Sequence, residues 1–210
     1  MDTNKTRRRL LRASGAGLLL ACPVATWAAE LATTPRQSTG PFYPNQLPLD
    51  DDNDLVQITG REQSARGTVT HMHGQVLDVN ARPIPNARVE IWQCDANGRY
   101  HHERDNRDAA PDPGFQGFGH NISNANGEYR FRTIKPVAYP GRTPHIHYKV
   151  IVPGAAAFTT QMYVAGEPQN TEDFLYRRLG AQEREQVTVA LKPNKTNNEF
   201  AGRFDIVVGS

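Results

Sequence analysis

The sequence predicts an all-β protein, an antiparallel β-sandwich with long loops and one short helix. Short runs rich in β-branched and aromatic residues follow one another from residue 67 to the C-terminus, with turn residues between them. Pro (15) and Gly (17) are frequent among the 210 residues, which favours turns over long helices. A chain of this length suits one domain with a sizeable core.

The expected strands are runs in which apolar and polar residues partly alternate. They cover residues 68–78, 88–92, 128–132, 145–152, 159–164, 186–191 and 203–208. A turn at Asn126-Gly127 precedes the third run. The one convincing helix is expected to begin near Thr171, to carry Asp173 in its first turn and to end at Gly180.

We expect three segments: an export signal over residues 1–29, an N-terminal arm over residues 30–66 and a β-sandwich domain over residues 67–210. The first segment holds five of the 24 basic and one of the 22 acidic side chains, which leaves 19 basic and 21 acidic ones. A near-neutral domain gives no support to nucleic-acid binding. The acidic run at residues 50–54 does not have EF-hand spacing and is expected to be a solvated loop.

The first 29 residues have the features of a twin-arginine export signal. Arg7 and Arg8 precede apolar residues, and the apolar stretch falls short of the ~20 residues that a spanning helix needs. We therefore expect a periplasmic protein, or one anchored in the membrane on the periplasmic side. Cleavage after Ala28 and lipidation at Cys22 are the two alternatives for the mature N-terminus. In either case Cys94 is expected to be a small buried thiol.

His145 and His147 form a His-x-His pair on an expected strand. Residues i and i+2 of a strand share a face, so the two imidazoles lie side by side while Ile146 points into the core. Tyr139 lies upstream in a Pro-Gly loop that can fold back over the pair. The pair alone is a weak sign of a metal site. The other histidines are expected to be exposed, locally hydrogen-bonded or structural: His71, His73, His101, His102 and His120.

A second segment runs from Trp92 through an Asn-Gly turn to Tyr100. On composition, Tyr100 is an ordinary core tyrosine. With these motifs, however, the chain resembles the intradiol ring-cleavage dioxygenases, and within them the subunits of protocatechuate 3,4-dioxygenase. The resemblance covers residues 34–43, 92–100, 126–136, 139–147, 160–163 and 203–207.

The resemblance implies a non-haem Fe(III) site with four protein ligands, Tyr100, Tyr139, His145 and His147. It also implies three catalytic residues. Tyr139 acts as a base, Arg142 stabilises developing negative charge, and Gln161 positions substrate or oxygen. Phenolate is a hard anionic donor and suits ferric iron, whereas the 2-His-1-carboxylate set suits Fe(II). Phe42 and Tyr43 either line the pocket or pack the arm.

The implied reaction is cleavage of a catechol-type ring with O2 to a muconate-type product. The expected partners are therefore a catechol-type small molecule and O2, and a homo-oligomer is left open. One alternative is an exported β-sandwich binding module with an inactive or differently metallated site. Another is a zinc hydrolase, although phenolates are unusual zinc ligands. The family's Asp-x-x-Gly turn has Ala81 in the glycine position, and Asn80 is expected to take the left-handed conformation.

Overall fold

The computed structural model describes residues 30–209. The expected export signal and both alternatives for the mature N-terminus therefore lie outside the described residues. Within the described part, no helix has the length and apolar character needed to cross a membrane.

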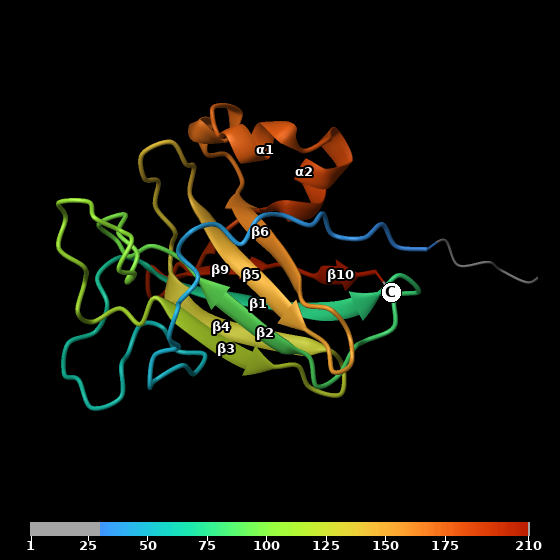
Figure 1. Ribbon diagram of the computed structural model, residues 1–210, viewed down its shortest axis with the longest axis horizontal. Helices are drawn as coiled ribbons and strands as arrows, with labels where there is room; N and C mark the ends of the chain where they lie inside the picture. Colours follow the sequence, from blue (N-terminus) through green and yellow to red (C-terminus); the bar gives the residue numbers. More distant parts are fainter. Residues whose placement is uncertain (1–29, 210) are drawn as a thin grey trace, which may run out of the picture.

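The first of two sheets is built around β1 (Val69–Asp78). Strand β4 (Glu128–Ile134) pairs with β1 in antiparallel orientation, whereas β9 (Phe200–Arg203) and β10 (Ile206–Val208) pair with it in parallel. A short strand, β8 (Lys192–Pro193), extends this sheet beside β9. Figure 1 shows β1 and β4 close together and the red C-terminal strands beside them.

The second sheet has the order β3-β2-β5-β6-β7. Its members are β3 (Phe118–Ile122), β2 (Arg88–Trp92), β5 (His145–Ile151), β6 (Phe158–Val164) and β7 (Thr188–Val189). All neighbours run antiparallel except β6 and β7. The all-β class is confirmed, but the expectation of purely antiparallel sheets is wrong. The helical segment between β6 and β7 forms the long crossover that their parallel pairing requires, whereas β9 and β10 come from the far end of the chain to pair in parallel with β1.

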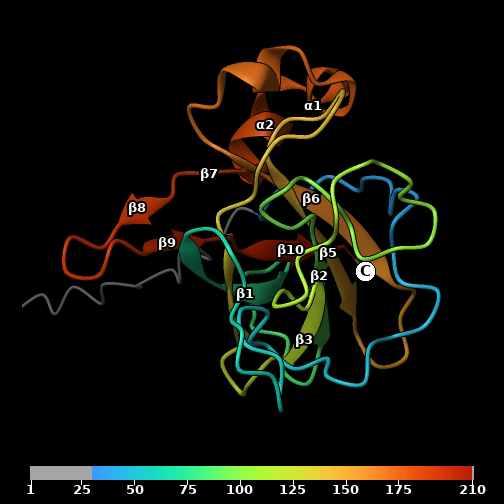
Figure 2. The same ribbon diagram turned by 90° about the vertical axis from the view of Figure 1, so that its left-hand side faces the viewer.

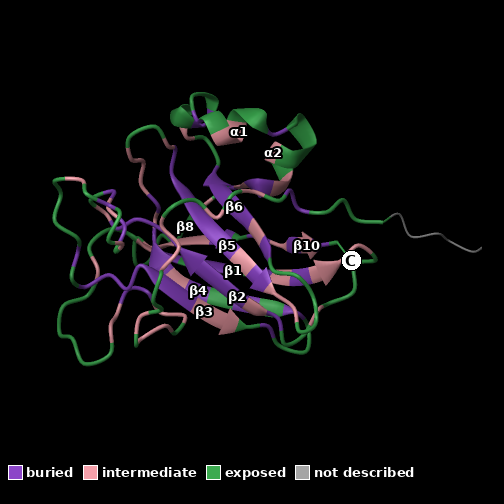
Figure 3. Cartoon of the chain, in the orientation of Figure 1, coloured by how far each residue is buried: buried purple, intermediate pink, exposed green. Residues whose placement is uncertain are grey.

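One apolar core takes residues from the inner faces of both sheets. Phe131 of β4 and Ile146 of β5 belong to it. The ring of Tyr148 packs edge-on against that of Phe204, with 4.9 Å between the centroids. In Figure 3 the buried residues follow the strands, while the helices are largely exposed. Ile146 is thus in the core, as the alternation in β5 predicts.

The helical region differs from its prediction. Instead of one helix there are three short ones, a 3-10 helix η1 (Pro168–Thr171), α1 (Phe174–Arg178) and α2 (Ala181–Val187). Asp173 accepts the first N–H groups of α1, and the side chain of Glu183 accepts the N–H of Gly180, the residue that caps the start of α2. The strand expected over residues 186–191 is present only as β7 (Thr188–Val189), because α2 occupies residues 186 and 187. Figure 2 shows the helices together beyond the end of β6.

Two turns show how local geometry is set. Gly127 has φ +72°, and a side chain there would lie 2.6 Å from the carbonyl oxygen of Val76, so the predicted turn requires glycine. In the turn after β1, Ala81 itself has φ 61°, so the left-handed residue is not Asn80. The carboxylate of Asp78 accepts the N–H groups on both sides of Ala81, at 2.8 Å each, and holds the strained residue in place.

Candidate metal centre

The two histidines of β5 lie on the outer face of the second sheet. His147 is opposite Trp92 of β2 and Gln161 of β6 in the strand register, so the three side chains form one row across three strands. Both imidazoles are buried, with 1% exposure for His145 and 2% for His147. Their ring centroids lie 4.9 Å apart. The sheet therefore presents a fixed pair of imidazoles, as the spacing predicted.

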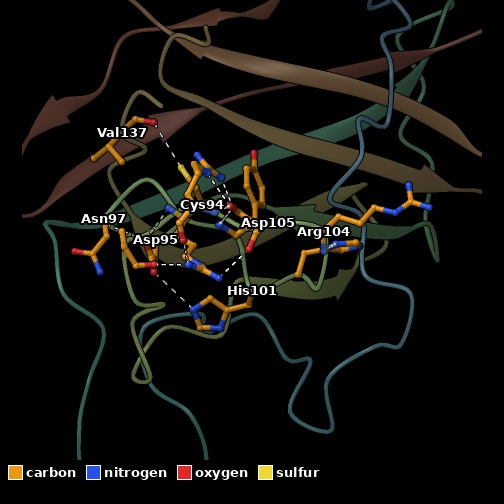
Figure 4. A network of polar contacts seen from close by, with 12 residues as sticks. Cys94, Asp95, Asn97, His101, Arg104, Asp105 and Val137 are labelled. Carbon is orange, nitrogen blue, oxygen red and sulfur yellow. Dashed lines mark hydrogen bonds and ion pairs between the residues drawn. The ribbon is translucent and has the colours of Figure 1, made fainter. Parts of the chain in front are cut away.

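A tight turn after β2 brings Tyr100 to this pair. The carboxylate of Asp95 accepts the N–H groups of Asn97 and Arg99 at 2.9 and 3.0 Å, which closes the turn. The N–H of Tyr100 is then held by Asp105 at 2.7 Å. Figure 4 shows Asp95 and Asp105 within this network of polar contacts. As a result the Tyr100 hydroxyl lies 3.4 Å from Nε2 of His145.

Tyr139 enters the cluster from a second turn. Its backbone N–H and carbonyl both pair with Arg142, and Gly141 between them has φ +80°. The Tyr139 ring lies 5.7 Å from that of Tyr100 and 5.5 Å from that of His145, between centroids. All four side chains expected to bind iron are therefore neighbours.

The donor atoms are set for binding a cation. Nδ1 of His145 lies 2.6 Å from the carbonyl oxygen of Thr143, which can only accept, so Nδ1 carries the proton and Nε2 offers its lone pair toward Tyr100. Burial, together with the charge of Arg142, lowers the pKa of His145 to about 3. Burial likewise lowers the pKa of His147 and raises that of Tyr100. Without a cation the cluster thus holds neutral imidazoles and a neutral phenol.

The predicted catalytic residues Arg142 and Gln161 lie at one edge of the cluster. One guanidinium nitrogen of Arg142 donates to the Gln161 side-chain oxygen at 2.6 Å. Its Nε donates to the carboxylate of Asp173 at 2.8 Å. Asp173 was expected only as a first-turn helix residue, and nothing in the sequence places it beside Arg142.

Two further side chains contact the predicted ligands, and the sequence predicts neither contact. The indole of Trp92 stacks on His147 with 4.8 Å between centroids and 6° between planes, which fixes the imidazole plane. The Arg107 guanidinium lies over the Tyr139 ring at 4.6 Å and pairs with Asp105. Trp92 belongs to the segment from Trp92 to Tyr100 that resembles the family. Its stacking on His147 follows only from the register of β2 and β5.

The N-terminal arm crosses the outer face of the second sheet, as the blue segment in Figure 1 shows. Gln161 donates to the carbonyl oxygen of Ser38 at 2.9 Å. A side chain at Gly40 would lie 3.2 Å from the His147 ring, so the backbone approaches the site closely there. Phe42 stacks on Tyr100 at 4.6 Å. The arm therefore covers the cluster and contributes aromatic surface to it.

Tyr43 anchors the arm beside the cluster. Its hydroxyl donates to the buried carboxylate of Glu90 at 2.8 Å, and Lys149 donates to the same hydroxyl at 3.1 Å. Tyr43 therefore packs the arm onto the sheet, and of the two aromatic arm residues it is Phe42 that contacts a predicted ligand.

Several of the other histidines have local polar partners. His71 contacts Glu199 at 2.7 Å, and Nδ1 of His120 lies 2.6 Å from the carbonyl oxygen of Asp51. In the acidic run, Asp54 pairs with Arg132 at 2.9 Å. Over residues 30–209 no group of three His, Cys, Asp or Glu side chains is placed to share a metal ion. The mixed cluster of tyrosines and histidines is thus the candidate metal centre.

Two hollows flank the cluster. One of about 500 Å³ is bordered by Tyr139, Arg142 and Asp173. A smaller one of about 150 Å³ reaches Tyr100 between Phe42 and Trp92. Another hollow, of about 470 Å³, is lined by His73, Tyr129 and Arg203 and includes none of the cluster residues.

The fold and the cluster define a class of protein. It is an all-β protein whose candidate metal ligands, tyrosines and histidines, lie on the outer face of a sheet. A family model described as "Dioxygenase" matches residues 38–210. The chain is 34% identical over 167 residues to the protocatechuate 3,4-dioxygenase beta chain of Burkholderia cepacia, which covers 75% of this chain and 71% of that one. The chain therefore belongs to the intradiol dioxygenase family, and the prediction of this enzyme class is confirmed.

Other relatives extend the comparison. Catechol 1,2-dioxygenase of Acinetobacter baylyi is 32% identical over 171 residues, 68% of this chain and 50% of that protein. The chain thus spans about half the length of this relative. Among solved structures, the dioxygenase domain of a dioxygenase carbohydrate-binding protein fusion from Streptomyces sp. SirexAA-E has 29% identity and a TM-score of 0.66. That match covers 85% of this chain and 99% of the domain.

Proposed function

We propose that the protein is a non-haem Fe(III) intradiol dioxygenase that cleaves catechol-type rings with O2 to muconate-type products. The observation that carries the proposal is the meeting of two phenols and two imidazoles at one buried point, with the Tyr100 hydroxyl 3.4 Å from Nε2 of His145. Relatives named for protocatechuate, catechol and hydroxyquinol support the same class of substrate.

The residues present fit ferric iron. Tyr100, Tyr139, His145 and His147 would hold it, because two phenolates offset most of its charge and hard anionic oxygen favours the ferric state. The lone pair on Nε2 of His145 already faces the phenol oxygen. When bound, ferric iron would withdraw electron density from a catecholate, so that a ring carbon becomes able to react with O2.

The two tyrosines have different roles in this proposal. Tyr100 is fully enclosed, whereas Tyr139 is partly exposed and lies on a loop beside the 500 Å³ hollow. Tyr139 is therefore the phenolate that can leave the cluster and take a proton at Oη from a substrate hydroxyl. Arg142, at the edge of the same hollow, faces the negative charge that develops on the substrate. Gln161 accepts a hydrogen bond from the Arg142 guanidinium, and we propose that it also positions substrate or oxygen.

Oxygen uptake with labelled gas tests the reaction. Purified iron-loaded protein is mixed with catechol, protocatechuate and hydroxyquinol in turn, under 18O2. We expect one O2 consumed per ring, and both labelled atoms in a dicarboxylic acid product. A product with one carboxylate and one aldehyde would instead indicate cleavage outside the diol, and no uptake with any of the three would contradict the proposal.

We also propose that the protein is exported by the twin-arginine route. It would then be free in the periplasm or held by a lipid anchor on the periplasmic side of the membrane. The support is the Arg7-Arg8 pair before an apolar stretch. The full chain is expressed in a Gram-negative host beside a variant with Lys at both positions. Wild-type protein should appear in the periplasmic fraction and the variant should not. Mass analysis of the mature N-terminus then separates cleavage after Ala28 from acylation at Cys22.

A further inference from the structure

Asp173 joins the helical region to the candidate metal centre. It is 2% exposed and directly precedes α1. Its Oδ1 accepts the N–H groups of Leu175 and Tyr176 at 2.9 and 3.1 Å. Its Oδ2 accepts Nε of Arg142 at 2.8 Å and the N–H of Thr143 at 3.0 Å. Each carboxylate oxygen therefore serves two donors, one pair from the helix and one from the loop that carries Arg142.

The guanidinium of Arg142 is fixed from two sides. Asp173 holds Nε, and Gln161 of β6 accepts from the terminal nitrogen at 2.6 Å. The arginine side chain is only 10% exposed, although it borders the hollow beside Tyr139. A long flexible side chain held in this way loses its alternative rotamers before any substrate arrives.

We propose that Asp173 is a positioning residue for the ring-cleavage reaction, which holds the Arg142 guanidinium toward the substrate side of the centre. This inference rests on the proposed function. Asp173 borders the hollow beside Tyr139 but makes no hydrogen bond to a predicted iron ligand, so it acts through Arg142. The position of helix α1 therefore affects the position of Arg142, because the same Asp173 carboxylate accepts hydrogen bonds from the first turn of α1 and from the arginine.

The charge of Asp173 is maintained in its buried position. Burial alone would raise the pKa of the carboxyl, but the hydrogen bonds from Arg142 and from the backbone N–H groups outweigh it and hold the pKa below its usual value. Asp173 is therefore ionised at neutral pH. A bond between an ionised acceptor and a guanidinium is shorter and stronger than one between neutral groups.

Substitutions can separate this role from simple helix capping. Asn and Ser both start helices about as well as Asp, so Asp173→Asn and Asp173→Ser keep an acceptor for α1 but lose the ionic partner of Arg142. The matched control is Glu183→Gln, because Glu183 accepts the N–H of Gly180 at the start of α2 and does not contact Arg142. Arg142→Gln and the Arg142→Gln/Asp173→Asn double variant complete the set.

Steady-state kinetics on the full iron-loaded chain test the inference. In both Asp173 variants, kcat and kcat/KM for catechol should fall together by roughly 10- to 100-fold, as expected when a catalytic group is misplaced by about 1 Å. Glu183→Gln should keep wild-type kcat within about twofold. In the Arg142→Gln background, Asp173→Asn should have less than about a twofold further effect, because the two residues act as one unit.

Thermal unfolding of the metal-free proteins supplies a readout that needs no activity. The fall in melting temperature of the double variant should be smaller than the sum of the falls in the two single variants. The reason is that each single change leaves one buried charge without its partner. The inference is overturned if wild type is active and the Asp173 variants match Glu183→Gln in kcat. It is also overturned if Asp173→Asn lowers kcat equally with and without Arg142. A wild-type protein without turnover on any catechol would overturn the proposed function and this role together. Melting-temperature shifts that simply add in the double variant would contradict the ion pair between Asp173 and Arg142 and leave the proposed function untouched.

Discussion

Nε2 of His145 faces the Tyr100 hydroxyl across 3.4 Å, although 45 residues separate them in the chain. The alignment depends on two unrelated local contacts. A carbonyl oxygen at Thr143 fixes the imidazole tautomer, and the carboxylate of Asp105 fixes the Tyr100 backbone. The geometry of the candidate centre therefore depends on contacts outside the four predicted ligands.

Tyr100→Phe should weaken iron binding severely. The variant removes one anionic donor, so the loss of affinity should exceed the roughly 10- to 100-fold that follows loss of an outer hydrogen-bond partner of a metal ligand. Iron content after dialysis against a competing chelator measures it. The matched control is Tyr148→Phe, since Tyr148 is also fully buried and its hydroxyl has no partner within the described residues. Equal iron retention in the two variants would contradict the assignment of Tyr100.

Gly98→Ala should disturb the centre as well as the turn. Gly98 has φ +74°, and an added Cβ would lie 3.2 Å from the carbonyl oxygen of Ala138 and 3.5 Å from the Tyr139 side chain. The left-handed backbone alone should cost about 1–2 kcal/mol of unfolding free energy. Gly154→Ala has the same strain, φ +81°, with nothing within 4 Å. Urea titrations should show losses in both variants, and only Gly98→Ala should also lower iron affinity.

Ile146→Ala should destabilise the fold without removing an iron ligand. Ile146 lies between the two histidines in sequence but in the core between the sheets. Its truncation should lower the unfolding free energy by about 2–5 kcal/mol, and the graded control Ile146→Val by about 0.5–1.5 kcal/mol. Chemical denaturation and iron stoichiometry check both parts. A loss of iron in a folded Ile146→Ala protein would mean that the alternation of β5 does not separate core from site.

Cys94 should be inert in the folded protein. Burial, with the nearby Asp95 carboxylate, raises the pKa of its thiol to about 12, so the reactive thiolate is scarce at pH 8. Iodoacetamide at pH 8 should leave the Cys94 peptide unlabelled until denaturant is added. Peptide mass spectrometry is the measurement, because it reads Cys94 separately from Cys22. Rapid labelling of Cys94 in native protein would show that the thiol is accessible.

Local patterns predicted the parts of the site that lie within one segment. The His-x-His spacing placed both imidazoles on one strand face, and the resemblance placed the two tyrosines with them. Asp173 and Arg107 could not be predicted, because each reaches the site through a contact between distant segments. No short motif encodes such a contact.

The fold shows the same division. The run over residues 88–92 is a strand with the predicted bounds, and the Asn126-Gly127 turn forms where expected. The strand expected over residues 186–191 begins as α2, because Glu183 starts a helix at Gly180 that ends only at Val187. The apolar alternation of Val187 and Val189 does not distinguish the end of a buried helix from a strand.

The visible absorption spectrum of the iron-loaded protein tests the central claim most directly. Two tyrosinates bound to Fe(III) should make the wild-type protein wine-red through charge transfer from phenolate to iron. Tyr139→Phe should keep part of this absorption through Tyr100 and shift its maximum, while Tyr148→Phe should leave the spectrum unchanged. A protein that holds iron stoichiometrically but is colourless, or that takes up zinc in preference to iron, would contradict the assignment of Tyr100, Tyr139, His145 and His147 as a ferric centre.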